Sequence, residues 1–194
     1  MESFEQFAAL DLEADGFVVS SAIKFPIRRR TKRASYVEYQ SHGYEVDLIG
    51  ARRDRLVLAT VKSYFGSTGV QSREVRGTGG GVSRYALIND RNLRNRIVEA
   101  AAERYGYRTN QVRLRMYVGK FAGQTKGAQE AEIRSWCASK IAGGGPIEVR
   151  SAKQIAHRVR EIAASTTYRD NPVIVTMKVL KQAGFLTEDV DIAE

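Results

Sequence analysis

Apolar residues recur along the chain at two spacings, and the helical spacing of three to four residues comes first. Phe4, Phe7, Ala8 and Leu12 follow it after a capping sequence of the S-x-x-Q type, which predicts a helix over residues 3–15. A short piece over residues 70–76 has room for two helical turns. The same periodicity predicts four further helices, over residues 91–104, 126–141, 151–164 and 172–183.

Short runs rich in β-branched and apolar residues lie between these helices and predict strands. They cover residues 17–25, 36–39, 44–51, 55–63, 112–117 and 147–149. Only a polar turn separates the run at 44–51 from the run at 55–63, so we expect these two strands to form a hairpin. The resulting order predicts an α/β domain over residues 1–150, with a mixed sheet flanked by helices, and a helical extension over residues 151–194.

The C-terminal extension allows two interpretations. Its closing segment, residues 178–186, is similar to the end of a recognition helix in winged-helix proteins, which would make it a DNA-binding element of a transcriptional regulator. No wing-like hairpin follows in the few residues that remain, which favours a helical cap packed on the sheet. We therefore expect a cap and keep the winged-helix interpretation open.

The charge balance indicates a partner. The chain has 31 Lys and Arg against 22 Asp and Glu, which gives a formal net charge of +9. Such a surplus attracts polyanions, and DNA is the partner that we expect. One segment has five cations in six positions, and further arginines follow in the turn of the predicted hairpin. The candidates for phosphate contacts are Arg28, Arg29, Arg30, Lys32, Arg33, Arg52 and Arg53.

Several classes of protein and site are not expected. No apolar run approaches the roughly 20 residues that a helix needs to cross a membrane, and the acidic start does not have the form of a secretory signal. We therefore expect no membrane partner and a cytoplasmic or nucleoid-associated protein. Cys137 is the only cysteine and the chain has two histidines, so neither an internal disulfide nor a structural zinc site is expected. Any metal ion would have to be held by carboxylates.

Candidate chemistry lies on the predicted hairpin. Asp47 lies within its first strand and Lys62 at the end of its second strand, so strand pairing would hold the two side chains close together. A carboxylate binds Mg²⁺ or Mn²⁺ through its hard oxygen atoms. An ammonium group can orient a water molecule or offset the charge that develops on a phosphate. Asp47 and Lys62 are therefore suited to the hydrolysis of phosphodiester bonds.

Over residues 3–120 the chain resembles the PD-(D/E)xK nuclease superfamily. The resemblance rests on a helix bearing a glutamate, a strand bearing Asp47, a following strand bearing Lys62, and then a helix and a strand. It implies a restriction-endonuclease-like αβββαβ core and magnesium-dependent cleavage of DNA. It also makes Asp47 the metal-binding aspartate, Lys62 the catalytic lysine and Glu5 the accessory glutamate of the first helix. Val46 stands where the superfamily often has proline.

Thr60 departs from that pattern, because it occupies the position of the second acidic ligand and carries no charge. Glu74 could supply the missing carboxylate from the piece after Lys62, and Glu45 could supply it from the strand of Asp47. We therefore expect a metal-dependent endonuclease, for which a homodimer would explain cleavage of both strands. The alternative is a DNA-binding, architectural or regulatory protein on the same fold that has lost its activity.

Overall fold

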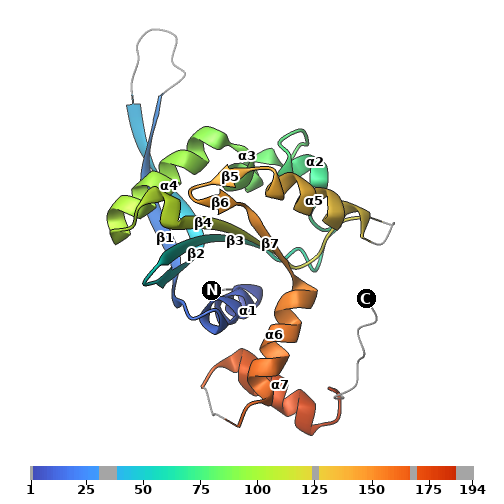
Figure 1. Ribbon diagram of the computed structural model, residues 1–194. Coiled ribbons are helices and arrows are strands. Elements are labelled where there is room, and N and C mark those ends of the chain that lie inside the picture. The colour runs from blue at the N-terminus through green and yellow to red at the C-terminus, as the bar shows by residue number, and fades with distance from the viewer. Residues whose placement is uncertain (1, 31–38, 124–126, 167–169, 187–194) are drawn as a thin grey trace.

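The computed structural model describes residues 2–30, 39–123, 127–166 and 170–186. They contain a five-stranded mixed sheet with helices on both faces (Figure 1), which confirms the expected α/β class. The strand order is β1-β2-β3-β4-β7; the first three strands are antiparallel, and β4 and β7 run parallel to β3. The bounds are β1 (Val18–Arg30), β2 (Tyr39–Arg52), β3 (Arg55–Lys62), β4 (Val112–Val118) and β7 (Glu148–Ser151).

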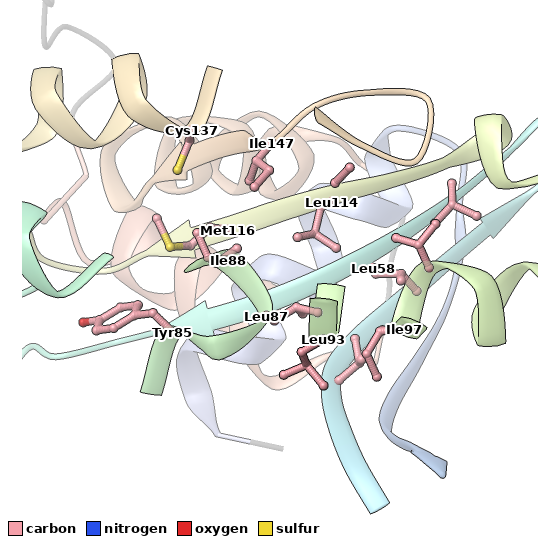
Figure 2. Packing of buried hydrophobic residues seen from close by; sticks show 14 of the residues in the cluster. Leu58, Tyr85, Leu87, Ile88, Leu93, Ile97, Leu114, Met116, Cys137 and Ile147 are labelled. Carbon is pink, nitrogen blue, oxygen red and sulfur yellow. The ribbon is translucent and has the colours of Figure 1, made fainter. Parts of the chain in front are cut away.

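The helices divide the core between the two faces of the sheet. On one face, apolar residues of β3 and β4 pack against the helices that follow β3, as Figure 2 shows for Leu58, Leu114 and Ile97. On the other face, α1, α6 and α7 cover a second cluster that includes Leu48 and Val57. The bounds are α1 (Ser3–Ala14), α2 (Ser72–Val75), α3 (Ala86–Asn89), α4 (Arg91–Tyr105), α5 (Ala128–Ala138), α6 (Ala152–Ala164) and α7 (Pro172–Gln182).

The first two strands are longer than the sequence pattern predicts. β1 was expected to end before Pro26, but it continues to Arg30, because β1 is an edge strand and a proline there removes no hydrogen bond from the sheet. β2 begins at Tyr39 and so joins runs that were predicted as separate strands; residues 36–38 lie outside the described residues. The two strands pair from Val18 with Ala51 to Arg30 with Tyr39.

Two predicted helices are shorter than expected, because the chain turns earlier. α5 ends at Ala138, since residues 141–146 form a small hairpin of β5 (Ile141–Ala142) and β6 (Gly145–Pro146). The expected two turns over residues 70–76 reduce to the single turn of α2. Short 3₁₀ turns, η1 (Val82–Tyr85) and η2 (Thr109–Gln111), precede α3 and β4.

The C-terminal helices belong to the second core cluster. The side chain of Ser151 accepts a hydrogen bond from the backbone N–H of Gln154 and so caps α6. Ile155 and Val159 of α6 are fully buried in the cluster that contains Leu12 of α1. In the part of the chain that the structure describes, no helix is long and apolar enough to cross a membrane.

Arg115 of β4 joins the end of α1 to the sheet. Its side chain is only 6% exposed, and its Nη1 lies 3.3 Å from Asp11 Oδ2 and 3.0 Å from Asp15 Oδ2. Its Nε donates to Glu148 Oε2 on β7 at 2.8 Å. Burial disfavours the charged guanidinium, but Tyr117, Glu148 and Asp15 hold the pKa of Arg115 above its ordinary value. Three carboxylates thus converge on one buried cation.

We predict that Arg115→Met lowers the free energy of unfolding by about 3–5 kcal/mol, because it leaves the buried carboxylate of Asp11 without its cation. Urea denaturation followed by circular dichroism measures the change. Arg53→Met, at an exposed turn position, is the control and should change stability by no more than about 0.5 kcal/mol. A loss below about 1 kcal/mol in Arg115→Met would show that the network contributes little.

Cys137 offers an independent measure of the core on the other face. Its side chain is fully buried, and burial raises the pKa of its thiol to about 12. Because the thiolate is the reactive form, Ellman's reagent at pH 8 should label the native chain on the order of 10³-fold more slowly than the urea-unfolded chain. Labelling of the native chain at the unfolded rate would contradict the packing of α5.

Candidate functional site

Asp47 lies where β2 and β3 separate. Their last pair is Leu48 with Ala59, and beyond it the Asp47 carboxylate occupies the space between the strands. Its Oδ2 accepts a hydrogen bond from the backbone N–H of Val61 at 2.6 Å and another from the Thr60 hydroxyl at 3.0 Å. The carboxylate therefore gives Val61 the acceptor that a paired strand would have given, and its own position is fixed by two donors.

The backbone of β1 is distorted directly across from Asp47. Ser21 pairs with Leu48 and Ile23 pairs with Val46, whereas Ala22 between them has a φ of 55°. A residue with a side chain seldom adopts this left-handed conformation, and it costs about 1–3 kcal/mol when imposed within a fold. The pairing of β2 is thus interrupted on both of its sides at Asp47.

Lys62 meets Asp47 from the end of β3. Its Nζ lies 3.9 Å from Asp47 Oδ2, and the two side chains are 18% and 23% exposed. The acid and the amine that the sequence singles out are therefore on the same side of the sheet and within reach of solvent. The backbone of Lys62 is held as well, because its carbonyl oxygen accepts a hydrogen bond from Gly119 N at 2.8 Å. A Cβ at Gly119 would lie 2.2 Å from Ser63 O, so only glycine fits there.

Thr60 determines whether this arrangement suits a metal ion. The threonine is buried, 6% exposed, and its hydroxyl donates to Asp47 where the resemblance would place a second carboxylate. Asp47 Oδ2 thus faces an N–H, an O–H and an ammonium group, which are partners for an anion and not ligands for a cation. Among the described residues, no group of three or more His, Cys, Asp or Glu could hold a metal ion. These residues, as arranged, do not fit a Mg²⁺ or Mn²⁺ site.

The three glutamates considered as further site residues each have another environment. Glu5 accepts a hydrogen bond from Glu2 N at 3.0 Å and so caps α1. Glu45 lies 3.6 Å from Lys24 on the neighbouring strand, and both side chains are largely exposed. Glu74 of α2 lies beside Gly81, where a Cβ would come within 2.8 Å of Glu74 Oε1. The structure gives all three carboxylates partners or neighbours other than Asp47.

The predicted phosphate-binding residues divide into three groups. Arg28, Arg29 and Arg30 end β1, and Lys32 and Arg33 lie outside the described residues. In the turn between β2 and β3, Arg53 is exposed.

Arg52 is instead held by the fold. Its Nε lies 2.8 Å from Asp54 Oδ1, its Nη1 donates to Asp15 O at 3.0 Å, and its guanidinium lies over the Phe17 ring. Of the two arginines in this turn, Arg53 is therefore the one that is free of such contacts with the body of the protein.

Sequence reasoning missed the direct bond between Thr60 and Asp47, although a signal was present. The two-residue turn fixes Arg52 opposite Arg55, and counting outward along the hairpin puts Thr60 opposite Asp47. A hydroxyl across from a carboxylate on one face of a strand pair is within bonding distance. The left-handed conformation of Ala22 had no comparable signal in the sequence. Glycine often marks a position with a positive φ, whereas alanine does not.

Comparison with known proteins adds no relative. No protein-family model, no curated protein and no solved structure matches the chain. The α/β class and the strand order rest on the structure alone. Membership of the PD-(D/E)xK superfamily stays a prediction from Asp47, Lys62 and the order of the elements.

Thr60→Glu tests whether one missing carboxylate separates this site from a metal centre. Without metal, the variant should be less stable than the wild type, because two carboxylates would face each other. With Mn²⁺ at about 100 times its dissociation constant, it should regain roughly 2.7 kcal/mol, measured as a rise in Tm. Thr60→Gln has a similar shape and no charge, so Mn²⁺ should leave its Tm unchanged. An equal rise in the wild type would show that the existing residues already hold the ion.

Proposed function

We propose that this protein binds DNA and does not cleave it, using a nuclease-like arrangement of strands in which the second carboxylate is replaced by Thr60. The observation that carries the proposal is the donor set around Asp47. Its Oδ2 accepts hydrogen bonds from Thr60 and Val61 and lies 3.9 Å from Lys62 Nζ, so donors and a cation of the chain itself already surround this oxygen. The net charge of +9 supports a polyanion as the partner.

The position of the arginines also supports DNA. The last residues of β1 are Arg28, Arg29 and Arg30, and β1 pairs with β2, the strand of Asp47. The backbone of these arginines and the candidate site therefore belong to the same pair of strands. Phosphate contacts of this kind release counterions from the DNA. Because they do not read the bases, they give similar affinity for duplexes of different sequence. A protein with this charge is therefore expected to show binding that depends steeply on salt.

A second candidate function is a metal-dependent endonuclease, and one observation favours it. Asp47 and Lys62 lie 3.9 Å apart, on one side of the sheet and partly exposed, as hydrolysis of a phosphodiester would require. This function needs a further carboxylate beside Asp47. Of the acids that the sequence singles out, Glu74 and Glu45 would have to move away from their present neighbours.

One pair of assays separates the two functions. Fluorescence anisotropy with a 20-base-pair duplex should show binding whose affinity falls roughly 40-fold or more between 50 and 200 mM salt, because about three or more phosphates are contacted. Supercoiled plasmid should stay intact with Mg²⁺, with Mn²⁺ and with a chelator.

Asp47→Asn and Lys62→Gln are the matched variants, because they remove each charge and keep most of the side-chain shape. Nicking that requires metal and is abolished by both changes would replace the proposal by the endonuclease. Absence of binding at 50 mM salt would overturn both functions.

A further inference from the structure

We infer that residues 23–30 and 39–46, here named the β1–β2 ribbon, enter the major groove of B-form DNA. This inference rests on the proposed DNA binding and adds the groove and the form of the duplex. The ribbon is the part of β1 and β2 that extends past Asp47, and in Figure 1 it projects from the body of the molecule.

The ribbon is a pair of strands without a third strand beside it in the described part of the chain. β3 leaves β2 after Leu48, and β1 is the edge strand of the sheet. In the described part of the chain, residues 39–46 therefore pair with β1 alone, from Val46 with Ile23 to Tyr39 with Arg30. Both long edges of the ribbon lack a strand partner, as an element that inserts into a groove requires.

The root of the ribbon is braced on one face. Phe25 and Ile27 are buried, 1% and 4% exposed, in the core that also contains α4. Arg104 of α4 donates from Nη1 to Lys24 O at 3.1 Å, and its guanidinium lies over the Phe25 ring. These contacts fix the root against the body, so the ribbon can be inserted without first being ordered.

The exposed residues of the ribbon suit a polyanion. Lys24 has a side chain that is 68% exposed, and Ser41, His42 and Gly43 are exposed as well. Over both strands, Lys24 and the three arginines outnumber the single carboxylate of Glu45. Among the side chains of residues 23–27 and 41–46, which the structure describes, no large apolar one is exposed. A protein partner would call for such a side chain, whereas a phosphate backbone calls for cations.

The dimensions select the groove. Two paired strands lie about 4.8 Å apart, and eight residues of each extend about 26 Å. The major groove of B-form DNA is about 12 Å wide and admits a two-stranded ribbon, whereas the minor groove is only about 6 Å wide. The major groove of double-stranded RNA is too deep and narrow.

Methylation by dimethyl sulfate tests the inference, because it reports guanine N7 in the major groove and adenine N3 in the minor groove. At saturating wild-type protein on a mixed-sequence duplex, we expect methylation at N7 to fall at least threefold and methylation at N3 to stay unchanged. The test variant carries Arg28→Gln, Arg29→Gln and Arg30→Gln. It should lose this protection, and its salt dependence should be shallower by up to about 3 in the log–log slope.

A matched variant removes three cations that lie away from the ribbon, through Arg108→Gln, Lys153→Gln and Arg160→Gln. It should keep the N7 protection, and equal Tm values would show that all variants fold. Protection of N3, N7 protection that persists in the ribbon variant, or equal affinity for duplex RNA would overturn the inference and leave DNA binding standing. Absence of binding by the wild type would instead overturn the proposed function.

Discussion

The separation of β2 from β3 beyond Leu48 is the constraint on which the candidate site and the ribbon both depend. Where two strands part, each loses hydrogen-bond partners. A backbone N–H that is shielded from water then needs another acceptor. Asp47 provides that acceptor for Val61, so the strands can part without leaving the amide unsatisfied. The same carboxylate then draws Lys62 and Thr60 towards it. One side chain thus lies where a strand pairing ends and brings a carboxylate, a hydroxyl and an ammonium group together.

Charge has a different role in the buried network of β4. Arg115 is buried among Asp11, Asp15 and Glu148, which come from α1, its C-cap and β7. Acidic residues near the C-terminal end of α1 are unfavourable for the helix dipole, and a nearby cation compensates for them. This network orders α1 against the sheet, whereas the Asp47 pair remains partly open to solvent. The contrast follows from the exposed fraction of each cationic side chain. Arg115 is 6% exposed and stabilises the structure, whereas Lys62 is 18% exposed and can be reached from solvent.

Much of the fold could be predicted from the sequence, because apolar periodicity is a local property. The helix that became α4 and the strand that became β4 were expected within a residue of their bounds. The length of β1 could not be predicted, because Pro26 ends most strands and is accepted here only through an edge position that emerges in the assembled sheet. The proximity of Asp47 and Lys62 could be predicted, because a hairpin with a short turn brings its two strands side by side. The environments of Glu5, Glu45 and Glu74 depend on residues distant in the sequence or on local caps, which the pattern does not specify.

Ala22 marks the root of the β1–β2 ribbon in the main chain itself. Its left-handed backbone falls at the level where the ribbon leaves the sheet, so this irregularity belongs to the main chain and not to a contact between side chains. Glycine would adopt this conformation freely, whereas a β-branched residue would resist it. The choice of this one small residue therefore sets how easily the backbone leaves the regular strand conformation at the root of the ribbon, and it does so without altering any charge of the ribbon.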